Sequence, residues 1–110
     1  MDNSCGQEEY VRQVLEAYRR TPGTTGTVRR ADRLLAAQLN QRGLSVSVIE
    51  NALVLAAARR LMRPAEALPL GTIRSLAYFI PVIEEVLVLP VNPDYFEYLR
   101  HKLARVAPHR

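Results

Sequence analysis

A chain of 110 residues, 48% of them hydrophobic, has the size of one domain and enough apolar material for a packed core, which argues against intrinsic disorder. Cys5 is the single cysteine, so an internal disulfide and a cysteine-based zinc site are both excluded. Residues 1–9 are polar and acidic, unlike a signal peptide, and the longest apolar run, 52–58, is far shorter than the ~18 residues that cross a bilayer. We expect a soluble, cytoplasmic protein without a membrane partner.

The net charge of +4 is concentrated in the middle of the chain. Residues 1–18 carry −3, residues 19–63 carry +7, and residues 64–110 are balanced. Fourteen of the fifteen basic residues are arginines, whose planar guanidinium makes the bidentate contacts that suit phosphate. A genome rich in G and C favours arginine in the same way without any function behind it, so composition leaves both explanations open.

The first predicted helix covers residues 7–20 and follows a flexible lead-in, residues 1–6. Acidic residues at its start and arginines at its end both suit the helix dipole. The segment 21–27, rich in Gly and Thr, is predicted to be a loop. The helix carries one apolar stripe at helical spacing, made of Val11, Val14, Leu15 and Tyr18.

The second predicted helix follows Thr27, a suitable N-cap, and ends at Gly43. The third begins near Ser47 with a capping-box pattern and runs to about residue 62. Residues 52–58 are apolar on every side, which is typical of a central helix surrounded by neighbours. The buried face expected for the second helix comprises Val28, Ala31, Leu35 and Leu39.

The fourth predicted helix covers residues 72–87. Pro81 removes a backbone donor within it and should kink or split the helix near Ala77. A fifth helix opens with the cap-like sequence of residues 92–94, an Asn followed by Pro and Asp.

These elements predict an all-α fold, a compact orthogonal bundle of about five helices. They form a single domain, residues 7–106, followed by a C-terminal tail, residues 107–110. No segment alternates between apolar and polar residues convincingly enough to be called a strand.

No catalytic constellation is recognisable in the chain. The two histidines, His101 and His109, both lie in the C-terminal region, where such side chains are usually solvated. Glu84 and Glu85 are adjacent and point about 100° apart on a helix, so they cannot share a site as a carboxylate pair. No nucleophile, Walker or dinucleotide-binding motif occurs. We therefore predict a protein that is not an enzyme and that needs no metal and no cofactor.

The second and third helices are joined by a short turn, which suggests a helix-turn-helix. Ile49, six residues after Gly43, occupies a position that is usually a buried aliphatic residue in such motifs. Leu39 stands where a small residue usually allows close crossing, and the third helix offers the bases almost no polar side chains. A plain helical hairpin therefore stays open as the alternative. The residues of the third helix able to reach a base edge are Ser45, Ser47, Glu50 and Asn51.

Most arginines fall in the final turns of predicted helices, where the dipole favours a cation, but Arg29, Arg30 and Arg33 do not. They occupy the first two turns of the second helix, where each cation costs about 0.3–1 kcal/mol. A preceding loop of Gly and Thr would offer N–H groups and hydroxyls to a phosphate. The alternative is a solvated face partly neutralised by Asp32. Five further arginines would widen a phosphate-binding surface if folding brings them close: Arg19, Arg20, Arg59, Arg60 and Arg63.

The segment 73–83, Ile-Arg-Ser-Leu-Ala-Tyr-Phe-Ile-Pro-Val-Ile, resembles a segment of replication-initiation and primosome proteins, in which an I-x-S-x-x-Y-F pattern closes a helical domain. Together with the two helices before it, the span 28–87 is similar to the helical portion of plasmid or mobile-element replication proteins. The resemblance implies DNA-associated work and assigns no individual residue.

The leading hypothesis is a non-catalytic nucleic-acid-binding accessory module that contacts mainly phosphate. The rival hypothesis is a helical adaptor for protein partners or a homodimerising domain. Tyr95 and Phe96 are neighbours, so the aromatic residues of the fifth helix cannot all face inward. The residues then available to a protein partner are Tyr95, Phe96 and Tyr98. An enzyme subunit that lends a helix to a partner's active site is a third possibility.

Overall fold

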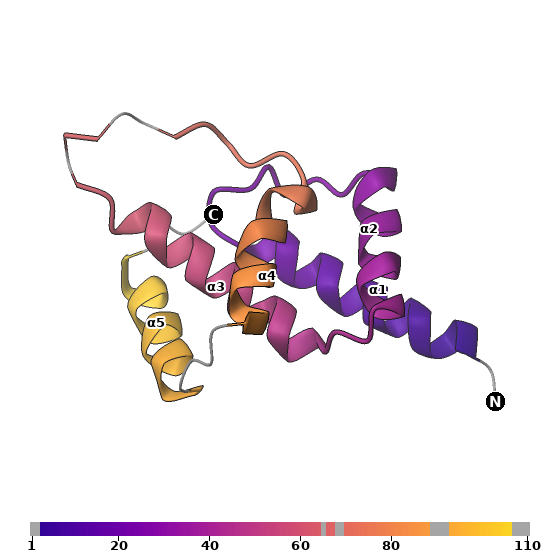
Figure 1. Ribbon diagram of the computed structural model, residues 1–110. Coiled ribbons are helices and arrows are strands. Elements are labelled where there is room, and N and C mark those ends of the chain that lie inside the picture. Colours follow the sequence, from indigo (N-terminus) through magenta and orange to yellow (C-terminus); the bar gives the residue numbers. More distant parts are fainter. Residues whose placement is uncertain (1–2, 65, 68–69, 89–92, 107–110) are drawn as a thin grey trace.

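Helix α3 (Val46–Leu61) is the centre around which the other helices pack (Figure 1). It contacts α1 (Asn3–Arg20), α4 (Ile80–Val88) and α5 (Pro93–Val106). Alanine and leucine side chains are buried on several of its sides, as expected for a helix that is apolar all round. The prediction of a central third helix is confirmed.

The computed structural model describes residues 3–64, 66–67, 70–88 and 93–106. Two further elements lie within these ranges, α2 (Arg30–Gln41) and the 3₁₀ helix η1 (Leu76–Phe79). The described part of the chain contains helices and a single isolated bridge, between Thr24 and Ile73, but no strand. The predicted all-α bundle is confirmed. No helix among the described residues combines the length and apolar character needed to cross a membrane.

The buried side chains form two clusters. The larger one joins α1, α2, α3, η1 and α4, and Tyr18 and Phe79 are its largest fully buried members. The smaller one joins α5 to α3 through Phe96 and Leu99, which pack against Leu55 and Ala58. α5 is therefore attached to the rest of the bundle by a small set of side chains of its own.

Helix α4 is shorter than the predicted fourth helix. Residues 72–75 are not helical, because the backbone of Ile73 pairs with the loop before α2: its N–H donates to Gly23 O (2.7 Å) and its carbonyl accepts from Thr25 N (3.0 Å). η1 follows, and α4 begins at Ile80 with Pro81 in its first turn, where a helix needs no N–H donor. The expected split at the proline is confirmed, whereas the expected start at residue 72 is wrong.

Three helix starts differ from the predicted ones. α1 already begins at Asn3, so residues 3–6 of the predicted lead-in are helical. α2 begins at Arg30, and its N-cap is Arg29 rather than Thr27. The N-cap of α3 is Ser45 rather than Ser47, because the Ser45 hydroxyl accepts the N–H of Val48 at 3.2 Å. The predicted cap at residue 92 and the predicted tail, residues 107–110, lie outside the described residues.

Helices α2 and α3 are joined by the short turn 42–45, which contains Gly43 at φ 80°. α2 packs mainly against α1 and η1, whereas α3 packs mainly against α1, α4 and α5. The two helices thus lie in different surroundings, and a helix-turn-helix remains a prediction.

Candidate nucleic-acid interface

The start of α2 is positioned by a buried carboxylate. Asp32 is 2% exposed, and each of its two carboxylate oxygens accepts a backbone N–H: Oδ2 from Arg29 and Oδ1 from Leu76, both at 2.9 Å. The first bond caps α2 from within its first turn, and the second ties η1 to the same helix end. The alternative interpretation expected Asp32 to neutralise the neighbouring arginine side chains partly, but both of its carboxylate oxygens accept hydrogen bonds from backbone amides.

Four exposed arginines lie at this helix end or on the segment that is hydrogen-bonded to it. Arg29 is the N-cap of α2, and Arg30 and Arg33 lie in its first turn. Arg74 joins them because its backbone lies between Ile73, which pairs with Thr24, and Leu76, which donates to Asp32. Among the described residues none of the four forms an ion pair with a carboxylate. We call Arg29, Arg30, Arg33 and Arg74 the basic edge.

The basic edge keeps an excess of positive charge. The Asp32 carboxylate compensates part of the cost of placing cations at the positive end of a helix dipole. Asp32 supplies one negative charge at a helix end that has four arginines nearby in the fold, however, and both of its oxygens already accept backbone N–H groups. The edge can therefore bind an anion without first breaking an ion pair.

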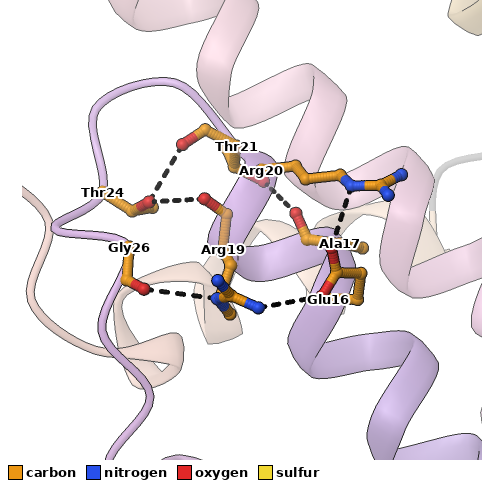
Figure 2. A network of polar contacts seen from close by, with 7 residues as sticks. All are labelled: Glu16, Ala17, Arg19, Arg20, Thr21, Thr24 and Gly26. Carbon is orange, nitrogen blue, oxygen red and sulfur yellow. Dashed lines mark hydrogen bonds and ion pairs between the residues drawn. The ribbon is translucent and has the colours of Figure 1, made fainter. Parts of the chain in front are cut away.

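Two of the other predicted arginines are paired within the chain. Arg19 Nη1 donates to Glu16 Oε1 at 3.1 Å and Arg20 Nε donates to Glu16 Oε2 at 3.0 Å, so one carboxylate holds both guanidinium groups (Figure 2). Arg19 also donates to the carbonyl of Gly26 at 3.3 Å, which ties the end of α1 to the loop before α2. Arg19 therefore stabilises that loop, and Arg20 is held by Glu16 within α1.

The three remaining predicted arginines are Arg59 and Arg60, in the last turn of α3, and Arg63, just after its end. Arg59 forms a bidentate ion pair with Glu85 of α4. Arg60 donates to Gly71 O at 2.7 Å and to Tyr78 Oη at 3.1 Å, with its guanidinium 5.6 Å from the centroid of the Tyr78 ring. Arg63 lines the same small cavity as Arg59 and Arg60. Arg59 and Arg60 thus connect elements of the fold.

The loop before α2 is not the anion cradle that its composition suggested. The hydroxyl of Thr21 donates to Ala17 O at 2.8 Å, and that of Thr24 donates to Thr21 O at 3.0 Å (Figure 2). The amide of Thr25 donates to Ile73 O, and that of Thr27 bonds the Thr25 hydroxyl at 3.2 Å. These hydroxyls and amides are therefore engaged in stabilising the loop and its pairing with Ile73.

The two adjacent glutamates of α4 bind different partners, as their angular separation requires. Glu84 accepts two hydrogen bonds from Arg42 of the α2–α3 turn, at 2.8 and 3.2 Å, and Glu85 pairs with Arg59 of α3. Hydrogen bonds from Arg42 and Arg59 lower the pKa of Glu84 and of Glu85, respectively. No group of three metal-ligating side chains exists among the described residues.

The predicted protein-binding aromatics are divided between core and surface. Phe96 is 3% exposed and packs in the cluster between α5 and α3, so its prediction as a partner-binding residue is wrong in the folded chain. Tyr95 and Tyr98 are 46% and 55% exposed and stack with ring centroids 6.4 Å apart. The outer face of α5 therefore presents two tyrosines.

Sequence reasoning missed Arg74 and the bond from Leu76 to Asp32, since both depend on a contact between α2 and a segment more than forty residues later. It also missed that Asp32 caps α2, although that bond, to the Arg29 amide three residues earlier, is local. Comparison with protein-family models, curated proteins and solved structures finds no match to this chain. The fold and the site together define a small helical bundle with a basic edge at one helix end.

Proposed function

We propose that this protein is a non-catalytic nucleic-acid-binding accessory module that holds the phosphate backbone of DNA or RNA with the basic edge. The observation that carries the proposal is the group of four exposed arginines without carboxylate partners at one end of α2. Guanidinium groups bind phosphate through charge-assisted, often bidentate hydrogen bonds. The resemblance of residues 73–83 to replication proteins supports a setting in DNA replication or in a mobile element.

Several other arginines are already engaged, which makes the basic edge the preferred site. Arg42 and Arg59 would have to leave Glu84 and Glu85 before they bound a phosphate. A mode dominated by phosphate contacts carries little sequence information. We therefore expect similar affinities for oligonucleotides of different sequence at a given salt concentration.

Fluorescence anisotropy with single- and double-stranded oligonucleotides tests the proposal. The variant Arg29→Ala, Arg30→Ala, Arg74→Ala should bind roughly tenfold or more weakly, because it loses three charge-assisted contacts. A matched control, Arg42→Ala, Lys102→Ala, Arg105→Ala, removes the same charge elsewhere and should bind nearly as well as the unaltered protein. Equal losses of affinity in the two variants would show that net charge, and not the basic edge, determines binding. An unaltered protein that bound no oligonucleotide would refute the proposal.

A second candidate function, a protein-interaction adaptor, is favoured by the exposed stack of Tyr95 and Tyr98. Lys102 lies 5.7 Å from the Tyr98 ring centroid and adds a cation to this face of α5. Aromatic residues are enriched at protein interfaces. Pull-down with the variant Tyr95→Ala, Tyr98→Ala tests this function, because an adaptor acting through α5 should lose its partner while keeping its nucleic-acid affinity.

A further inference from the structure

A hollow of about 300 Å³ lies where the end of α3 meets η1 and α4. This volume is at the low end of the range for ligand sites in proteins, roughly 300–1,000 Å³, and suits a single planar ring system. No acidic residue lines the hollow within the described part of the chain, and Glu85, which pairs with Arg59, is not among its lining residues. The hollow therefore suits an anionic ligand with a flat apolar part. Its lining includes Ala56, Arg59, Arg60, Arg63, Tyr78 and Val82.

The Tyr78 ring in this hollow is held in place and still accessible. Arg60 donates to Tyr78 Oη at 3.1 Å and to Gly71 O at 2.7 Å, and its guanidinium lies 5.6 Å from the centroid of the tyrosine ring. The fully buried Phe79 contacts the same ring edge to face, with centroids 5.2 Å apart. Tyr78 is nevertheless 45% exposed. Aromatic rings and guanidinium planes are the protein groups on which unpaired bases stack, so a fixed, exposed ring beside an arginine is a ready stacking surface.

The hollow and the basic edge are connected through η1. The amide of Leu76, the first residue of η1, donates to Asp32 in the first turn of α2, and Tyr78 follows two residues later. Arg74 of the basic edge is four residues before Tyr78, so their Cα atoms are at most about 14 Å apart. A polyanion that contacts Arg74 is therefore within a short distance of the hollow.

We propose that this hollow takes one base of a single-stranded nucleic acid, which stacks against Tyr78 and Arg60 while the basic edge holds the phosphates. The inference rests on the proposed function and names its substrate class. A base within a duplex is paired and stacked between its neighbours, so only a single strand presents a base to the hollow. Every base has a π-face, and stacking is therefore compatible with the expected tolerance of sequence.

Fluorescence anisotropy with two labelled strands of equal length tests the inference. One strand is oligothymidylate, and the other is an abasic strand that keeps the phosphates and lacks the bases. At the same salt concentration the unaltered protein should bind oligothymidylate roughly tenfold more tightly, because stacking adds to the phosphate contacts. Tyr78→Leu should lower the affinity for oligothymidylate to that for the abasic strand. Tyr78→Phe keeps the ring and should keep most of the preference.

Two controls separate this inference from the proposed function. Tyr98→Leu removes an equally exposed tyrosine outside the hollow and should keep the preference. Arg29→Ala, Arg30→Ala, Arg74→Ala should weaken the binding of both strands by the same factor. Equal binding of the two strands by the unaltered protein, or an equal loss of preference in Tyr78→Leu and Tyr98→Leu, would overturn the inference and leave the basic edge as a phosphate site. A protein that bound neither strand would refute the proposed function itself.

Discussion

Asp32 shows how one side chain can organise two distant segments. Its carboxylate binds the amide that begins α2 and the amide that begins η1, although these lie more than forty residues apart. A buried N–H without an acceptor costs about 1–3 kcal/mol. The two hydrogen bonds that Asp32 accepts from backbone amides therefore offset the cost of removing its carboxylate from water. The same bonds bring Arg74 to the basic edge.

We expect Asp32→Ala to lower the free energy of unfolding by about 2–4 kcal/mol, because it removes a helix cap and leaves two amides without their acceptor. Asp32→Asn keeps one amide oxygen as an acceptor and should cost less. Urea titration followed by circular dichroism measures both losses. A loss below about 0.5 kcal/mol for the alanine variant would show that the carboxylate is not needed to satisfy these amides.

Tyr18 is fully buried, and its hydroxyl has no hydrogen-bond partner among the described residues. Burial raises the pKa of Tyr18, and the nearby Asp32 carboxylate raises it further. Tyr18→Phe keeps the edge-to-face contact with Phe79, at 6.1 Å between centroids, and removes the buried hydroxyl. We expect equal stability or a gain of about 1 kcal/mol in thermal unfolding. A clear loss would reveal a partner for the hydroxyl.

At the scale of elements, α5 is the part of the bundle that should open first, because a small cluster with α3 holds it. Phe96→Ala removes the largest side chain of that cluster. Hydrogen exchange should then show faster exchange in α5 while α1 and α3 keep their protection. Tyr98→Ala, a change on the outer face, is the control and should leave the exchange of α5 nearly unaltered. Equal loss of protection in all three helices would show that α5 unfolds only with the whole domain.

Helix α4 is joined to its neighbours by two ion pairs that respond to acid. Arg42 and Arg59 lower the pKa of Glu84 and Glu85 in the folded chain, below the value of about 4.3 in the unfolded chain. A carboxyl with a depressed pKa contributes stability that is present above the unfolded value and is lost as the pH falls through the folded value.

The midpoint of thermal unfolding should therefore fall when the pH drops below about 4.3. The variant Glu84→Gln, Glu85→Gln should show a smaller fall over the same interval, because it lacks the two carboxyl groups. If the unfolding midpoint falls equally with pH in the variant and in the unaltered protein, the acid sensitivity belongs to other groups. Glu9 is one such group, because Arg12 lowers its pKa.

The existence of the helices is largely predictable from the spacing of apolar residues, whereas the exact residues at which they begin are not. Apolar spacing correctly indicated α1, α2, α3 and α5, and the apolar run 52–58 correctly indicated the central position of α3. Residues 72–75 also have a helical pattern, but the backbone of Ile73 bonds the loop before α2, so tertiary contacts override the local pattern. Similarly, α2 starts where Asp32 can cap it, two residues later than the N-cap pattern indicated.

At the scale of the whole molecule, the basic edge was only partly predictable. The position of Arg29, Arg30 and Arg33 at the start of a helix follows from the helix pattern. Among the described residues they have no carboxylate partner, as expected for an exposed cationic surface. The ion pair of Arg59 with Glu85 joins α3 to α4, and the hydrogen bond from Arg60 to Gly71 O joins α3 to the connector that follows it. Local sequence carries no signal for such contacts.

The salt dependence of nucleic-acid binding tests the central claim most directly. For duplex DNA, log Kd changes with log salt by about 0.9 per phosphate neutralised. Replacing Arg29, Arg30 and Arg74 with alanine should therefore lower that slope by about 2.7, whereas the control variant of Arg42, Lys102 and Arg105 should keep it. An unchanged slope in the first variant would contradict the account.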